Sequence, residues 1–243
     1  MTTNGTTNGD FDYSIHPPIA NDKITLYVKT ANPTNTANTL KPLILLEALQ
    51  IPHHIHIIIS TSNETWFHKI NPYKMVPAME DPLPSAQSVN LFDSSACLLY
   101  LAEKWDKEGV FSGKGDKERG AVMSWLMGYT AGLGATGKTW LMLLPKLPAD
   151  SDALAILVGW IRKDYDVLEA RLSEADQEWI ALGDRPTIAD FAIWPHANAK
   201  VAAMAKIEFG EWPRLKGWSE RIAELGYVRK AVDRVGAFGH GGS

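Results

Sequence analysis

The segment GLGATGKT at residues 132–139 has the spacing of a phosphate-binding loop, in which backbone amides and a lysine hold the phosphates of a nucleotide. Such a loop needs a β-branched strand before it and a long helix after it. The residues before this segment, AVMSWLMGYTA, are tolerant of a helix, and prolines interrupt the LMLLPKLP that follows. No apolar run ending in an acidic metal ligand appears downstream. The pattern therefore does not predict a nucleoside triphosphatase.

A second group able to do chemistry is the histidine cluster formed by His53, His54 and His56. In a strand, alternation puts His54 and His56 on one face, where two imidazoles could bind a metal. No carboxylate or cysteine joins them in the same strand. We therefore expect an edge or surface cluster and no metal site.

Composition limits the class of protein. Cys97 is the single cysteine among 243 residues, which excludes an intrachain disulfide and fits a reducing compartment. A formal net charge of −4 gives no general attraction to nucleic acid or to acidic lipid. No apolar stretch approaches the length of a membrane span, and the first residues lack the features of a secretory signal. We expect a cytoplasmic protein that binds neither nucleic acid nor membrane.

The first half of the chain alternates strand and helix patterns. Extended segments are expected at residues 23–29, 51–59, 76–80 and 89–92. Helices are expected at residues 40–49, where Pro42 would lie in the first turn, and at residues 93–105, which open with an acid and serines. A polar loop, TANPTNTANT, is expected before the first helix. The order strand, helix, strand predicts a parallel pair with a right-handed crossover.

The second half shows helical periodicity alone. The periodic stretches are residues 119–133, 152–172, 187–205 and 213–232, with prolines at their joints. The predicted division is a disordered tail (1–20), an α/β domain (21–105), a linker (106–118), an all-helical domain (119–234) and a flexible tail (235–243).

Four segments in this order resemble the glutathione transferase family. INPYKMVPAM (70–79) is similar to the family's NPxxxVPxL segment, and LFDSSACLLYLAEKW (91–105) to its helix with an acid and a serine at the start. RPTIADFAIWP (185–195) resembles the capping segment of the family's helical domain, and EWPRLKGWSERI (211–222) the helix that closes the fold. The resemblance implies a thioredoxin-like N-terminal domain, an all-α C-terminal domain, glutathione as co-substrate and a homodimer.

The resemblance also implies where glutathione binds. Val76, before a cis-Pro77, would pair through its backbone with the cysteinyl part of glutathione, with Lys74 and Met75 beside it. Asp93 and Ser94 would receive the γ-glutamyl end. Asp93 replaces the family's glutamate, which shortens the reach to the ligand ammonium, while Ser94 and the helix N-terminus remain a carboxylate site.

The activating group for the glutathione thiol is expected in the loop at residues 34–42. A related fungal subgroup places an asparagine there, and Asn38 falls at that position, with hydroxyls from Thr36 and Thr39 beside it. Tyr27 is the alternative, because several classes use a tyrosine on the first strand and because it lies opposite the apolar face of that strand. Cys97 lies too far along the chain to match the classes that use a cysteine at the active site, and it is expected to be buried.

A narrower resemblance is to the fungal transferases of epidithiodiketopiperazine (gliotoxin-type) biosynthesis, which add glutathione to an electrophilic diketopiperazine. It is carried by TxNTxKPLILLEAL, INPxKMVPA and GLGATGK. It implies that Asn35, Asn38 and Lys138 face the reacting centre, with Lys138 polarising a substrate carbonyl. Two alternatives stay open: a non-catalytic regulator or assembly module on this fold, and a glutathione-dependent isomerase or peroxidase.

Overall fold

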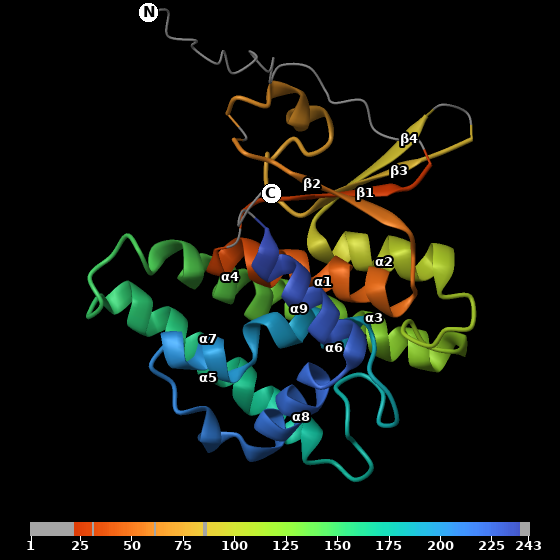
Figure 1. Cartoon of the computed structure of the whole chain (residues 1–243). Helices are drawn as coiled ribbons and strands as arrows, with labels where there is room; N and C mark the ends of the chain where they lie inside the picture. The colour runs from red at the N-terminus through yellow and green to blue at the C-terminus, as the bar shows by residue number, and fades with distance from the viewer. Residues whose placement is uncertain (1–21, 31, 61, 85–86, 239–243) are drawn as a thin grey trace, which may run out of the picture.

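The computed structural model describes residues 22–30, 32–60, 62–84 and 87–238. It confirms an α/β half followed by an all-helical half (Figure 1). The predicted N-terminal tail, residues 1–20, lies outside the described residues. Within the part of the chain that the structure describes, no helix has both the length and the apolar character needed to cross a bilayer.

A four-stranded sheet in the order β2-β1-β3-β4 forms the centre of the first half. Its strands are β1 (Ile24–Val28), β2 (His53–Ile57), β3 (Ala78–Pro82) and β4 (Ser88–Phe92). Strand β1 is parallel to β2, as predicted, and antiparallel to β3, with Leu26 opposite Ile55 on one side and Met79 on the other. Strand β4 pairs antiparallel with β3.

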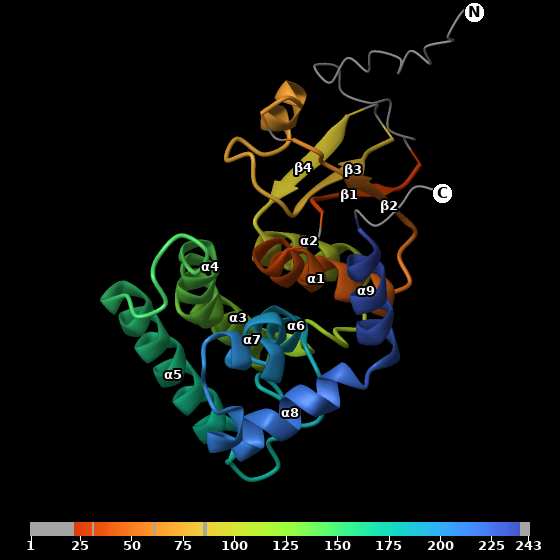
Figure 2. The ribbon, with the colours of Figure 1, turned by 60° about the vertical axis from the view of Figure 1, so that its left-hand side comes forward.

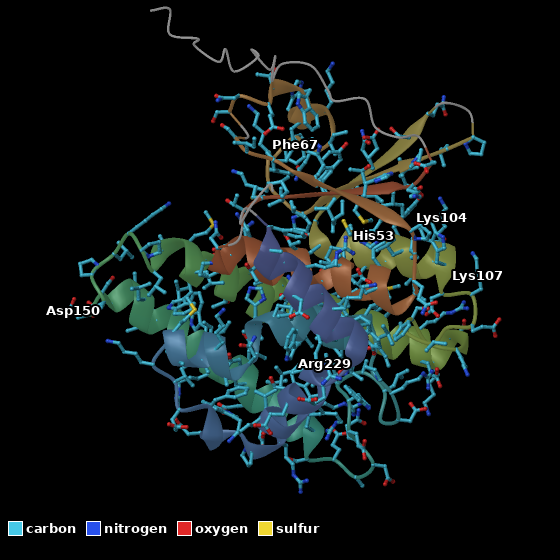
Figure 3. All side chains as sticks on the ribbon, viewed as in Figure 1. His53, Phe67, Lys104, Lys107, Asp150 and Arg229 are labelled. Atoms are coloured by element: carbon cyan, nitrogen blue, oxygen red, sulfur yellow. The ribbon has the colours of Figure 1, made fainter. Side chains whose placement is uncertain are left out.

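Both faces of this sheet are covered. Helices α1 (Pro33–Ala48) and α2 (Ser94–Trp105) lie on one face, and the short helix η1 (Thr65–Lys69) lies on the other. Figure 3 shows Phe67 of η1 on the side of the sheet away from the helical half. All five residues of β1 are therefore buried, which is the condition of a central strand covered on both faces.

Helix α1 begins seven residues earlier than predicted. The expected loop TANPTNTANT is largely helical, because Asn32 caps the helix by accepting from the Asn35 amide at 2.8 Å and Pro33 occupies its first position. Pro42 consequently lies inside the helix, where the prediction had put it in the first turn. It has no N–H to donate to the carbonyl of Asn38, one turn earlier.

The second half contains nine helical segments among the described residues. They are α3 (Gly115–Ala131), α4 (Leu133–Leu143), α5 (Asp152–Leu172), α6 (Ile188–Ile193), η2 (Trp194–His196), α7 (Ala199–Met204), η3 (Phe209–Glu211), α8 (Pro213–Ala223) and α9 (Gly226–Ala237). The prediction for α5 was correct. The stretches 187–205 and 213–232 are each broken into separate helices, and α4 was not predicted as a helix of its own.

Figure 2 shows the helical half beneath the layer of α1 and α2, with α4 and α5 on one side and α9 on the other. Helix α9 packs on α1, where the buried carboxylate of Glu47 pairs with Lys230 and Arg234. The predicted C-terminal tail therefore starts too early, because α9 continues to Ala237. This contact ties α9 to the first domain.

The segment Thr187–Asp190 is a capping box, and its role is structural. Asp190 is buried, and its Oδ2 accepts from the Thr187 amide at 2.8 Å. Its Oδ1 accepts from the Ile180 amide and from the Trp218 indole, each at 2.9 Å. Burial raises the pKa of this carboxyl, against the effect of its hydrogen bonds. One side chain thus joins α6, α8 and the loop before α6.

Candidate functional site

A cavity of about 830 Å³ lies between the two halves of the chain. Its first wall is polar and comes from the start of α1, the loop at residues 71–77 and the start of α2. Its second wall is mostly apolar and comes from α4, the loop after α4 and Met204 of α7. A ligand with one polar and one apolar part fits such a division.

The loop that precedes β3 is shaped by a residue that sequence reasoning gave no role. Asn71 is buried, its Nδ2 donates to the Met75 carbonyl at 2.7 Å, and its Oδ1 accepts from the Tyr73 amide at 2.9 Å. The Val76–Pro77 peptide bond is cis, as the resemblance implied. Among the described residues Val76 makes no backbone–backbone hydrogen bond, so its amide and carbonyl remain available to a peptide-like ligand.

Lys74 and Met75 also line the cavity, next to Val76. Lys74 is in the left-handed region, with φ of 53°, so the chain turns sharply just before Val76. The Sδ of Met75 lies 3.5 Å from the Nζ of Lys138 on α4. The two walls therefore touch at this point, and Lys138 lines the cavity.

At the start of α2, Asp93 and Ser94 line the same cavity. The Oδ1 of Asp93 caps the helix by accepting from the Ser95 amide at 2.8 Å and more weakly from the Ala96 amide at 3.4 Å. The carboxylate of Asp93 is thus bound to its own helix while remaining exposed to the cavity. Ser94 is buried, and its amide and hydroxyl are the donors left for a ligand carboxylate.

Asn38 lies in the second turn of α1 and lines the cavity, whereas the prediction placed it in a loop before the helix. Its Nδ2 donates to the Thr34 carbonyl at 3.1 Å, and its Oδ1 accepts from the Lys41 ammonium at 2.8 Å. Asn35 also lines the cavity, and its Nδ2 donates to the Thr30 carbonyl at 3.3 Å. Both asparagines are therefore held by the backbone near the start of α1.

The structure does not bring Thr36 and Thr39 to the cavity. They follow Asn35 and Asn38 on a helix, where successive residues turn by about 100°, so their hydroxyls leave the cavity side. Thr39 is buried, and its Oγ1 finds no partner among the described residues. The cavity is lined instead by Thr34, one turn before Asn38.

Tyr27 does not line the cavity, so the structure does not support it as the alternative sulfur ligand. Its position opposite the apolar face of the strand did not require it to be core, but it is fully buried beside Trp66 and Phe67, because η1 covers that face of the sheet. Its hydroxyl donates to Glu80 at 2.8 Å, and burial is the largest cause of its raised pKa. Cys97 is also buried, as expected, and burial raises the pKa of its thiol.

Lys41 is the residue that the sequence reasoning missed. It is only 3% exposed, and its ammonium lies 3.2 Å from the Ser94 hydroxyl and 4.8 Å from the ring centroid of Tyr129. A signal was present, because Lys41 lies four residues from Ala37 and from Leu45, both buried, and so shares their face of α1.

The glycines of the segment at residues 132–139 serve packing. The segment spans the junction of α3 and α4, where no strand precedes it. A Cβ on Gly137 would lie 2.6 Å from Cδ2 of the buried His196. Such closeness leaves no room for a side chain, which explains the glycine without a nucleotide.

The three histidines of β2 have separate partners. His53 contacts Glu47 and the Ile51 carbonyl, while His54 contacts Asp22 and His56 contacts Glu64. Within the described ranges, no group of three or more histidine, cysteine, aspartate or glutamate side chains is arranged to hold a metal ion.

Two family models match the sequence. The model for the glutathione S-transferase N-terminal domain matches residues 37–104, and the model for the C-terminal domain of the same family matches residues 135–225. The first match contains the Val76–Pro77 bond and the start of α2, and the second contains α5 and the capping box.

Among curated proteins, the chain is similar to the glutathione S-transferase tcpG of Claviceps purpurea (strain 20.1). The two are 52% identical over 229 residues, which cover 90% of each chain. It is also similar to the glutathione S-transferase sirG of Leptosphaeria maculans, at 44% identity over 89% of this chain and 93% of the other. Among solved structures, a glutathione transferase homolog from Lodderomyces elongisporus, with two GSH per subunit, has a TM-score of 0.75 at 26% identity. That match covers 88% of this chain and 99% of that one.

Proposed function

Because this chain belongs to the glutathione S-transferase family, we propose that it conjugates the glutathione thiolate to a hydrophobic electrophile of fungal secondary metabolism, such as a diketopiperazine. The chain is an enzyme of the transferase class, with glutathione as its co-substrate. One observation carries the proposal: the polar wall with Val76, Ser94 and Asn38 faces the apolar wall of α4 across a single cavity.

Glutathione is a tripeptide, and the polar wall offers groups that suit its two ends. The free amide and carbonyl of Val76 would pair with the cysteinyl part. The amide and hydroxyl of Ser94 would bind the γ-glutamyl carboxylate, and the exposed Asp93 carboxylate would attract the ammonium beside it. Lys74 and Met75 would flank the peptide.

Activation of the thiol would come from Asn38. A free thiol has a pKa of about 8.5, so the enzyme must favour the thiolate, which is the nucleophile. One N–H of the Asn38 side-chain amide donates to the Thr34 carbonyl. The other N–H would donate to sulfur. Asn35 would act as a second donor at the edge of the cavity.

The apolar wall suits the electrophile. Leu141, Met142 and Leu144 of this wall would contact a hydrophobic substrate, and Lys138 would polarise its carbonyl as the sulfur–carbon bond forms. The electron pair of the thiolate makes that bond while the π bond at the attacked carbon opens, and the negative charge that passes to the conjugated carbonyl oxygen faces the lysine. The proximity of Lys138 to Met75 supports this placement.

The experiment is a product search. The protein is incubated with glutathione and candidate electrophiles, including activated diketopiperazines, and adducts are identified by mass spectrometry. We expect a glutathione adduct that depends on the protein and is diminished in Asn38→Ala. Glutathione binding without thiolate formation would support the regulator instead. Consumption of a peroxide without an adduct would support the peroxidase, and isomerisation of a substrate without an adduct would support the isomerase.

A further inference from the structure

A buried lysine lies behind the polar wall, and nothing in the function proposed above uses it. The Lys41 ammonium contacts Asn38 Oδ1 at 2.8 Å and Ser94 Oγ at 3.2 Å, and it lies over the ring of Tyr129. Across the described residues it forms no ion pair. Two neutral oxygens and one ring face thus surround a side chain that is 3% exposed.

The charge of this lysine is costly. Burial lowers the pKa of Lys41 to about 7, Asp93 at the start of α2 opposes that shift, and Lys138 from α4 adds to it. From the other packed elements, Tyr129 of α3 and His196 of η2 face the same interior. Burial first, and then the charge on Lys41, lower the pKa of His196. A methionine of similar length would fill the space without this penalty. Packing therefore does not explain why an ammonium is here.

The contact of Lys41 with Asn38 shows which way the side-chain amide of Asn38 faces. An ammonium has only donors, so the group that faces it must be the amide oxygen. The NH2 group of Asn38 then lies on the opposite side, where one N–H binds the Thr34 carbonyl and the other remains for a ligand. Lys41 thus adds to the Thr34 carbonyl, which favours the same orientation; without Lys41 that single contact would hold the amide.

The same reasoning applies to Ser94. Its hydroxyl oxygen accepts from Lys41, so its own proton is left to donate toward the cavity. A donor polarised by a cation also binds an anion more strongly than the same donor alone. One ammonium thus acts on the residue proposed for the thiol and on the residue proposed for the carboxylate.

Building on the proposed function, we propose that Lys41 is a positioning residue that makes both Asn38 and Ser94 hydrogen-bond donors toward glutathione. Lys41 contacts Asn38 on its own helix, α1, and Ser94 at the start of α2. It does not itself line the cavity. Its effect on the thiol therefore passes through Asn38, and its effect on affinity passes largely through Ser94.

The test measures glutathione binding by calorimetry and the pKa of the bound thiol by ultraviolet titration, in the full chain. Lys41→Met should weaken glutathione binding by about tenfold and raise the pKa of the bound thiol by about one unit, the effect of one charge-assisted hydrogen bond. Lys41→Gln, a second neutral variant, receives the same measurements, so that the result does not depend on one substitution folding well. Unchanged affinity and thiol pKa in both folded variants would overturn the proposal.

A double-mutant cycle separates positioning from simple loss of charge. If Lys41 acts through Asn38, then Lys41→Met should shift the thiol pKa much less in an Asn38→Ala background than in the wild type. An equal shift in both backgrounds would overturn the positioning role. Lys107→Met is the matched control, because it also removes one positive charge, from an exposed lysine past the far end of α2 (Figure 3). It should leave both quantities unchanged.

The wild type distinguishes this inference from the proposed function. If the wild-type chain neither binds glutathione nor forms its thiolate, the proposed function fails and the inference fails with it. If the wild type does both while the Lys41 variants match it, the proposed function stands and only the role of Lys41 is overturned.

Discussion

The side chain of Asn38 donates to the backbone carbonyl of Thr34, one helical turn earlier and 3.1 Å away. A residue expected in a polar loop ahead of the helix is therefore held within α1. Only one of its two N–H groups remains for the sulfur of glutathione, so its contribution is that of a single hydrogen bond.

Asn38→Ala should raise the pKa of the bound thiol by about one to two units, since a hydrogen bond to a charged group contributes ~1.5–3 kcal/mol. Conjugation should slow near neutral pH and recover as pH rises. Asn38→Asp is the matched variant: it can still bind Lys41, but it replaces the donor with a negative charge, and its thiol pKa should rise further. Ultraviolet titration measures all three proteins, and an unchanged curve in Asn38→Ala would contradict the assignment.

Tyr27→Phe should leave the thiol pKa unchanged, because Tyr27 lies on the face of the sheet away from the cavity. It should lower the free energy of unfolding by about 1 kcal/mol, since the hydrogen bond to Glu80 is lost. Urea unfolding and the same ultraviolet titration measure the two effects. A shift of the thiolate titration curve in this variant would indicate that Tyr27 contacts the sulfur.

Ser94→Ala and Ser95→Ala form a matched pair at the start of α2. Ser94 lines the cavity, whereas the hydroxyl of Ser95 is 2.8 Å from that of Thr130 on α3. Ser94→Ala should weaken glutathione binding by about tenfold, or ~1.4 kcal/mol. Ser95→Ala should reduce stability and leave affinity intact. Calorimetry that finds equal affinities in wild type and Ser94→Ala would remove Ser94 from the site.

Lys41 predicts how stability changes with pH. Its pKa falls from 10.5 to about 7 on folding, so between these values the unfolded chain binds more protons than the folded one. The free energy of unfolding should therefore rise as pH increases from about 7 to about 10. Lys41→Met should be more stable than wild type at pH 6, by an amount that shrinks toward pH 10. Urea unfolding at several pH values measures this, and a difference that is constant with pH would contradict it.

Asp190→Ala should lower the free energy of unfolding by about 3 kcal/mol or more, because buried donors from Ile180, Thr187 and Trp218 would lose their acceptor. Asp233→Ala, an exposed change on α9, is the control and should cost little. Thermal and urea unfolding compare the two variants. Similar stability in both would show that the network contributes less than its burial indicates.

We expect a homodimer, as the resemblance to the family implied. Met123 and Met127 lie one turn apart on α3 and are 52% and 39% exposed, which gives this helix an apolar face suited to a second copy. Met127→Glu should weaken self-association. Sedimentation of wild type and variant across micromolar concentrations measures this, and a monomeric wild type would contradict the expectation.

Much of the architecture was predictable because it depends on local patterns. The extended pattern of residues 23–29 predicted β1, the helical period predicted α5, and the order of strand and helix predicted the parallel pair. The loop with Val76 and Pro77 and the start of α2 were recognisable for a similar reason, since the residues involved are adjacent in the chain. The N-cap at Asn32 followed by Pro33 also signalled the true start of α1, although the polar composition of that stretch favoured a loop.

The sequence by itself thus determined which segments become strands and helices, which of them carry polar groups at their ends, and that the chain divides into an α/β half and a helical half. Only the tertiary structure decided that η1 buries Tyr27, that Thr36 and Thr39 turn away from the cavity, and that Lys41 lies beneath Asn38 and Ser94. The physical reason is that periodicity shows which face of an element is apolar but not what covers it. Burial, hydrogen-bond partners and shifted pKa values depend on contacts between residues far apart in the chain, and those exist only once the elements have packed.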